Sequence, residues 1–224
     1  MYKYVKRILD LIIAITLFII FLIPMIIISI LIKLDSKGPV LFKQVRTGKN
    51  GKPFNLYKFR SMAVDNDVHD FSKQDNHTKV GDVLRKTSLD ELPQIINILK
   101  GEMSFIGPRP WITDYYENMT EEQRHRNDVL PGITGLAQAK GRNNITIFDK
   151  INYDLEYVQN YSFIQDVKIV FLTIKTVLSK EGADAGKGTI QIELDTLKTQ
   201  QLKISDIRKL DEQRQKKNNN YQRV

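Results

Sequence analysis

The feature that most constrains this chain is an apolar run near its amino terminus. From Leu11 to Ile32 the sequence reads LIIAITLFIIFLIPMIIISILI, twenty-two residues without a charge. At a rise of about 1.5 Å per residue, a helix of that length reaches roughly 33 Å, which is enough to cross a bilayer. The run is longer than the apolar region of a signal peptide, and no small-residue cleavage site follows it. Uncharged helices of this length are rare in soluble cores, so the sequence predicts a membrane segment.

A proline in the middle of this run leaves its path through the membrane open. Pro24 removes a backbone donor and clashes with the carbonyl four residues earlier, so it kinks or breaks a helix, and each half is too short to cross alone. Ser29 and Thr16 are the hydroxyls that are candidates to serve the freed backbone groups. From these residues alone, a turn-back and a kinked single-pass helix are equally open. The cationic residues that mark cytoplasmic loops lie on both sides of the run, as Lys3, Lys6 and Arg7 before it and Lys33, Lys37, Lys43 and Arg46 after it.

The chain as a whole is basic and has no cysteine. Its 224 residues allow one domain with appendages. The 34 Lys and Arg residues outnumber the 26 Asp and Glu residues, and the net charge of +8 predicts anionic partners such as acidic lipid headgroups or phosphorylated small molecules. Nucleic acid is not expected, because the basic residues are spread over all segments without an aromatic-basic recognition motif. The absence of cysteine excludes disulfides and thiolate sites, and the three histidines, at positions 69, 77 and 125, lack the close pairing of a zinc site.

The part beyond the apolar run is predicted to be mostly α-helical with a small β-hairpin. The hairpin joins strands over 39–46 and 53–60 through a Gly/Asn turn. A helix is expected to begin with capping-box spacing at 88–91 and to stop at Gly101, and an amphipathic helix is expected over 164–178. The predicted division is a membrane helix over 1–35, a main domain over 36–183 and a basic, polar extension over 184–224 that forms a loose helix and a frayed tail.

Asp90 and Glu91 are the first candidates for chemistry. Adjacent carboxylates at a helix start are often only electrostatic caps, worth about 0.3 to 1 kcal/mol each. Their neighbours favour a further role, because Arg85 lies one turn earlier and Arg109 is held between two prolines, where a guanidinium can be aimed at a phosphate. Arg142 is a third candidate for phosphate binding. Each of these arginines can also be interpreted as an ordinary surface charge.

A second acidic group, Asp65-Asn66-Asp67, is similar to the Asp-x-Asp with which many glycosyltransferases hold a metal and a nucleotide diphosphate. A nucleotide-binding α/β half should precede such a motif. Only the membrane segment and the hairpin precede it here, so we expect a solvated loop, and a metal-dependent glycosyltransferase is kept as an alternative.

Several ordered blocks together resemble the monotopic phosphoglycosyl transferase family, the small bacterial sugar transferases that prime capsule and exopolysaccharide synthesis. The resemblance covers roughly residues 1–182. It is carried by the basic start with its proline-broken apolar run and by the blocks GPVLFKQ at 38–44, YKFRSM at 57–62, RKTSLDELPQ at 85–94, LKGEMS at 99–104, GPRP at 107–110, PGITGLAQ at 131–138 and GRN at 141–143.

The resemblance implies a re-entrant, helix-break-helix membrane segment and a catalytic domain on the cytoplasmic face of the bacterial inner membrane. It implies transfer of a sugar 1-phosphate from a UDP-sugar to polyprenyl (undecaprenyl) phosphate, with release of UMP. Asp90 would be the nucleophile that forms a covalent aspartyl phosphosugar, Glu91 its partner, and Mg²⁺ would bind near Asp90. The phosphate-binding candidates are Arg85, Arg109 and Arg142, with Lys58 and Arg60 serving the nucleotide or only the fold.

One position departs from the family pattern, and some properties stay open. Ile23 precedes Pro24 where family members commonly have Ser, which weakens the expectation of a turn-back. A non-enzymatic, membrane-anchored basic interaction module is the alternative from a different class. The sugar, the role of the extension and homo-oligomerisation cannot be predicted from the residues.

Overall fold

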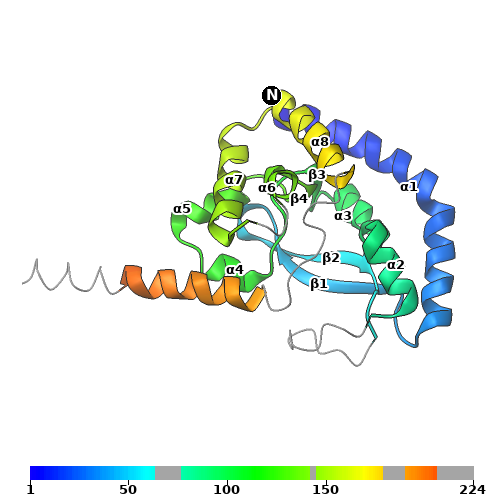
Figure 1. Ribbon diagram of the computed structural model, residues 1–224. Coiled ribbons are helices and arrows are strands. Elements are labelled where there is room, and N and C mark those ends of the chain that lie inside the picture. The colour runs from blue at the N-terminus through cyan, green and yellow to red at the C-terminus, as the bar shows by residue number, and fades with distance from the viewer. Residues whose placement is uncertain (64–76, 142–144, 179–189, 206–224) are drawn as a thin grey trace, which may run out of the picture.

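The computed structural model describes residues 1–63, 77–141, 145–178 and 190–205. Its body is mostly helical and carries two small sheets, and one long helix runs along its side (Figure 1). The expected content of helices with a small hairpin is therefore confirmed. The helices are α1 (Tyr2–Asp35), α2 (Lys79–Thr87), α3 (Gln94–Lys100), α4 (Thr113–Glu117), α5 (Glu121–Arg124), α6 (Leu136–Lys140), α7 (Ile147–Gln159) and α8 (Phe163–Leu178), with 3₁₀ turns η1 (Lys49–Gly51), η3 (Leu89–Glu91) and η4 (His125–Asn127).

The two sheets have two strands each. Strands β1 (Leu41–Thr47) and β2 (Pro53–Phe59) form the antiparallel hairpin that the sequence predicts, with Arg46 opposite Phe54 and Phe42 opposite Lys58. Strands β3 (Ser104–Ile106) and β4 (Gly132–Thr134) form a parallel pair that the sequence did not predict. Side chains opposite one another on paired strands share a face, so the register places Arg46 and Lys58 on the same face of the hairpin.

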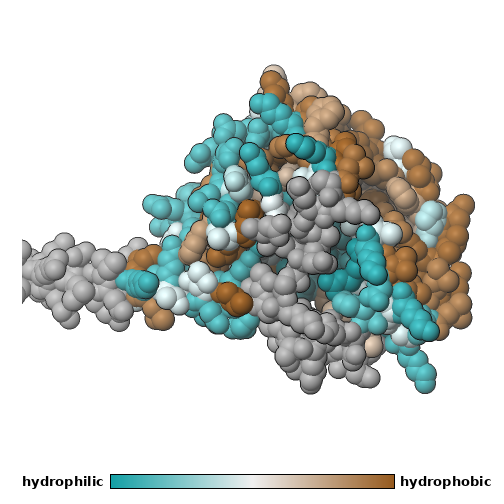
Figure 2. Space-filling view, in the orientation of Figure 1, coloured by the Kyte–Doolittle hydropathy of each residue, from teal (hydrophilic) through white to brown (hydrophobic). Residues whose placement is uncertain are grey.

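Helix α1 packs one face on the body along most of its length. Its first half contributes Ala14 to a cluster with Ile98 and Met103, and its second half contributes Ile32 to a cluster with Phe59. Its other face is exposed and apolar, with Ile19 at 67% and Ile23 at 69% exposure. Apolar side chains accordingly gather over α1 and over α8 in Figure 2. By length and composition, α1 is the one helix in the described part of the chain that could cross a membrane.

The helix is continuous through Pro24 and changes direction partway along its length (Figure 1). The hydroxyls expected to serve the freed carbonyl do not reach it. Ser29 donates to Met25 O at 2.6 Å and Thr16 to Ile12 O at 2.9 Å, whereas the proline frees the carbonyl four residues before it. The idea that these two residues compensate for the missing donor is therefore wrong.

Both ends of α1 are tied to the same body by polar contacts. Near its start, Lys6 forms a buried ion pair with Asp166 of α8, and Arg7 donates to Ile98 O at 2.6 Å. At its end, Arg60 donates to the carbonyl oxygens of residues 36 and 37 at 2.7 and 2.8 Å. The bonds from Arg60 hold the chain just past the end of α1 against the hairpin.

Helix α8 lies close to the predicted range of 164–178 but turns its apolar stripe outward. Ile164 is 67% exposed and Phe171 is 69% exposed, while only Asp166 and Ile169 of this helix are buried. An outward apolar stripe on a helix beside α1 extends the apolar surface of the molecule rather than its core.

The extension contributes a docked helix over residues 190–205, drawn in orange in Figure 1. Leu194 and Leu197 are buried in a cluster with Tyr115 and Ile151. Glu193 pairs with Lys150 at 2.6 Å and accepts a hydrogen bond from the Tyr115 hydroxyl at 2.8 Å. This part of the extension is therefore packed against α4 and α7, whereas we had expected it to be loose.

Candidate active site

The Asp90–Glu91 pair lies in the 3₁₀ turn η3 between α2 and α3. Ser88 ends α2 in a left-handed conformation with φ of 57°, and its side chain caps nothing. The predicted capping box at 88–91 is therefore wrong, because the chain turns at Ser88 instead of entering a helix there. Leu89 and Leu92 pack on the cluster that contains Ile32 and Phe59, so the turn is fixed against the hairpin and α1.

Glu91 is held by two cations. Its Oε1 atom is 2.9 Å from Lys58 Nζ and 3.0 Å from Arg109 Nη2. Burial favours a raised pKa for Glu91, but the charges and hydrogen bonds of Arg109 and Lys58 lower that pKa to about 2. The same pairing raises the pKa of Arg109, while burial lowers that of Lys58. Glu91 is therefore an ionised carboxylate fixed in place between the hairpin and the loop after β3.

Asp90 is buried beside Glu91 but is not held in this way. Its exposure is 9%, and within the described ranges no side-chain hydrogen bond or ion pair reaches its carboxylate. Burial raises the pKa of Asp90 and Glu91 adds to that effect, while Lys58, Arg85 and Arg109 oppose it. The two neighbouring carboxylates thus differ: Glu91 is paired with two cations, whereas Asp90 has no such partner among the residues that the structure describes.

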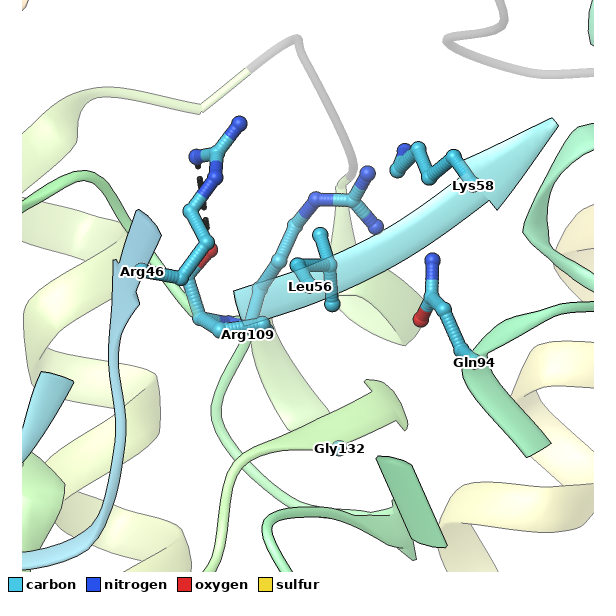
Figure 3. Close-up of a pocket in the computed structure, with 7 residues that line it drawn as sticks. Arg46, Leu56, Lys58, Gln94, Arg109 and Gly132 are labelled. Carbon is cyan, nitrogen blue, oxygen red and sulfur yellow. Dashed lines mark hydrogen bonds between the residues drawn. The ribbon is translucent and has the colours of Figure 1, made fainter. Parts of the chain in front are cut away.

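A small cleft opens beside the two cations that hold Glu91 (Figure 3). In Figure 3 the Arg109 guanidinium lies between the Arg46 guanidinium and the Lys58 ammonium. The Gln94 side chain points into the cleft from α3. Three cations on one cleft suit a ligand with more than one anionic group. The cleft is lined by Arg46, Leu56, Lys58, Gln94, Arg109, Pro110 and Gly132.

The loop that carries Arg109 is held from below by a buried ion pair. Arg126 donates to Asp154 Oδ2 at 2.6 and 2.9 Å and to the backbone carbonyl of Arg109 at 2.9 Å, and its guanidinium lies 3.8 Å from the centre of the Trp111 ring. Close backbone packing helps, since a Cβ at Gly132 would meet the backbone nitrogen of residue 107 at 2.2 Å. The backbone of the loop at Arg109 is therefore fixed by these contacts, and this fixes the position from which the Arg109 side chain reaches Glu91.

The other residues singled out from the sequence fall in different places. Arg85 is exposed and contacts the His77 ring at 3.1 Å, near enough to Asp90 to act on its pKa. Arg60 is 6% exposed, and its two terminal guanidinium nitrogens donate to backbone carbonyls just past the end of α1, so these contacts serve the fold and we remove it from the proposed ligands. Arg142 and the triplet at 65–67 lie outside the described residues.

Two cleft residues were not singled out as ligands by the sequence. The sequence marked Arg46 only as a charge that flanks the membrane segment. The predicted hairpin, which pairs the end of one strand with the start of the next, is the signal that could have placed it on the same sheet as Lys58. Gln94 is 3% exposed, and no side-chain partner for it is found among the described residues. Its position four residues after Asp90 is the signal that could have marked it.

Residues 1–180 match the sequence model of a family described as bacterial sugar transferase. The chain therefore belongs to the bacterial sugar transferase family, and the expected phosphoglycosyl transferase class is confirmed.

Three named relatives are similar to the chain over most of its length. The chain is 49% identical to the uncharacterized sugar transferase EpsL of Bacillus subtilis, over 67% of this chain and 76% of the relative. It is 39% identical to the UDP-glucose:undecaprenyl-phosphate glucose-1-phosphate transferase of Caulobacter vibrioides, over 80% of this chain and 71% of the relative. It is 41% identical to the UDP-N-acetylgalactosamine-undecaprenyl-phosphate N-acetylgalactosaminephosphotransferase of Aeromonas hydrophila, over 81% of this chain but 45% of that longer relative.

Proposed function

We propose that this enzyme transfers a sugar 1-phosphate from a UDP-sugar to undecaprenyl phosphate, forms a covalent phosphosugar on Asp90, and releases UMP. The observation that carries the proposal is the difference between the two carboxylates, with Glu91 held by Lys58 and Arg109 and Asp90 unpaired within the described ranges. A nucleophile needs free oxygen lone pairs next to groups that stabilise the charge of the phosphate under attack. The names of two relatives state sugar-phosphate transfer to undecaprenyl phosphate, which supports this choice.

The reaction then has two displacements. In the first, an oxygen of Asp90 attacks the phosphorus that carries the sugar, the bond from that phosphorus to the bridging oxygen breaks, and UMP leaves with the bonding electron pair. In the second, an oxygen of undecaprenyl phosphate attacks the same phosphorus, which gives undecaprenyl-diphospho-sugar and restores Asp90. Lys58 and Arg109 already face the cleft and can exchange their contact with Glu91 for contact with phosphate oxygens.

Mg²⁺ is the cofactor that we propose, with Asp90 as the side chain that would hold it. The described residues contain no group of three acidic or histidine side chains that would form a metal site alone. Mg²⁺ commonly binds through one or two carboxylates together with substrate phosphates, and Asp90 offers such a carboxylate. When bound, the ion would screen the repulsion between Asp90 and the donor diphosphate. Orientation of the donor remains the task of Lys58 and Arg109.

We propose that α1 enters and leaves the membrane on the cytoplasmic face and that anionic lipids face the basic body. Support comes from the contacts at both ends of α1: Lys6 with Asp166 at the start and Arg60 with the residue 36 carbonyl at the end. A helix that spans a bilayer separates its ends by the membrane, so both ends could not contact one soluble body. The exposed apolar faces of α1 and α8 would then lie in the lipid.

The test uses the full chain in nanodiscs with Mg²⁺, undecaprenyl phosphate and a panel of UDP-sugars, and separates UMP from UDP among the products. We expect UMP with at least one donor and no UMP from Asp90→Asn, while Asp114→Asn, a change at a carboxylate outside the cleft, retains activity. UDP as the product would instead support a glycosyltransferase that uses the triplet at 65–67. Turnover that survives in Asp90→Asn would refute the assignment of the nucleophile.

A further inference from the structure

Arg46 is a cation in the cleft that the two displacements described above do not use. It lies on the same face of the hairpin as Lys58, with its guanidinium beside that of Arg109 (Figure 3). Lys58 and Arg109 both contact Glu91, whereas the hydrogen bonds that Arg46 makes to described residues go to neutral groups, namely the Pro110 carbonyl at 3.5 Å and the Gln44 side chain. Its Nε atom is buried and has no hydrogen-bond partner in the part of the chain that the structure describes.

A buried donor such as this Nε atom is costly to leave without a partner, and a ligand that accepts from it removes that cost. Burial and the adjacent Arg109 lower the pKa of Arg46 to about 10, and the negative charge of Glu91 only partly offsets them. A phosphate group supplies the missing charge and accepts from the guanidinium fork.

The position of Arg46 along the hairpin indicates which phosphate it receives. Lys58 precedes Phe59, which shares a cluster with Ile28 and Ile32 of the apolar run of α1, whereas the turn after Arg46 lies near Lys3 in the basic start of that helix. Arg46 lies four residues farther along β1 than the partner of Lys58, which is about 13 Å of strand. A lipid-linked acceptor approaches from the apolar side, and the opposite end is left for the water-soluble part of the donor.

We infer that Arg46 binds the phosphate of the departing nucleotide, an inference that rests on the proposed function. When the phosphorus bound by Asp90 separates from the bridging oxygen, that oxygen stays on the nucleotide with the electron pair, and UMP gains negative charge. Arg46 donates to this phosphate while Lys58 and Arg109 hold the phosphate that carries the sugar. Arg46 is thus a leaving-group residue, separate from the residues that serve the nucleophile.

The experiment measures binding of UMP and of uridine by calorimetry to the full chain in nanodiscs, for the wild type, Arg46→Gln, Arg46→Lys and Lys43→Gln. Lys43 is an exposed cation on the same strand that lies on the opposite face and serves as the control. We expect Arg46→Gln to weaken UMP binding by about tenfold or more, the loss typical of one charge-assisted hydrogen bond, and to leave uridine binding unchanged. Arg46→Lys should recover part of the UMP affinity, and Lys43→Gln should match the wild type.

Turnover assays on the same samples separate this inference from the proposed function. We expect Arg46→Gln to raise the inhibition constant of UMP and to leave the KM for undecaprenyl phosphate unchanged. Equal UMP affinity in wild type and Arg46→Gln, absence of UMP binding to the wild type, or a rise in the acceptor KM alone would overturn the inference. Loss of UMP binding in Arg46→Gln, with no UMP released by the wild type from any donor, would leave the nucleotide site standing and refute only the transfer reaction.

Discussion

Replacing Arg126 with Met tests how the loop that carries Arg109 is held. The side chains of Arg126 and Asp154 are 1% and 2% exposed, and they meet at 2.6 Å. Removing one partner of a buried ion pair leaves the other charge uncompensated and costs about 3 to 5 kcal/mol. In a chain of this size each kcal/mol lowers Tm by about 2 to 4 °C, so we expect Arg126→Met to lower Tm by about 6 to 20 °C. Activity should also fall, because the Arg109 backbone loses its donor.

The assay follows the fluorescence of Trp111, the single tryptophan of the chain, which lies under the Arg126 guanidinium. Arg126→Met with Asp154→Leu should be more stable than Arg126→Met alone, because the double change leaves no buried charge. Arg124→Met, on a half-buried neighbour, should cause a smaller fall in Tm. A shift of less than about 2 °C for Arg126→Met, or no recovery in the double variant, would refute the view that this pair supports the loop.

Two further predictions concern the membrane helix and the extension. Single cysteines at Tyr2 and at Lys37, in this chain without cysteine, should both be shielded from an impermeant thiol reagent in intact cells, and labelling at Tyr2 alone would establish a spanning α1. Leu197→Ala should lower the free energy of unfolding by about 2 to 5 kcal/mol, measured by thermal unfolding, because Leu197 is fully buried against α4 and α7. Leu202→Ala, at a 64% exposed position, should change stability little, and equal effects of the two variants would contradict the docked helix.

The elements that the sequence predicted well are those with strong local signals. The hairpin follows from alternating strands around a Gly/Asn turn, and its observed register begins at Thr47 and Pro53, close to the expected ends. Gly101 ends α3 with φ of 82°, as a glycine after a helical run predicts. The apolar length of α1 and the spacing of α8 likewise come directly from composition and period.

The errors occur where tertiary packing overrides a local pattern. The residues at 88–91 have capping-box spacing, but Leu89 and Leu92 pack on the hairpin and α1, and this holds the segment in a 3₁₀ turn. The parallel pairing of β3 with β4 joins segments of three residues each that are far apart in sequence, and no local periodicity marks such short strands. The apolar stripe of α8 has the period of a buried helix, and the sequence alone does not say whether protein or lipid covers it.

The candidate site could be predicted only in part for the same reason. Asp90, Glu91 and Arg109 were named from local patterns and family blocks, and the structure brings Lys58 and Arg109 onto Glu91. Arg60 is an arginine like the phosphate-binding candidates, but it is buried at the end of α1 and binds the backbone there. The contrast between Asp90 and Glu91 depends on which side chain meets the cations, and adjacent residues in sequence do not reveal that.

The measurement that most directly tests the central claim is trapping of the phosphosugar on Asp90. The full chain in nanodiscs is mixed with the donor and Mg²⁺ but without undecaprenyl phosphate, quenched and digested with trypsin, and the peptide Thr87–Lys100 is sequenced by mass spectrometry. The account predicts a burst of UMP of no more than one per enzyme and a phosphosugar mass on Asp90, which disappears when the acceptor is added. Full turnover with no adduct at any time, or an adduct on Glu91 instead, would contradict it.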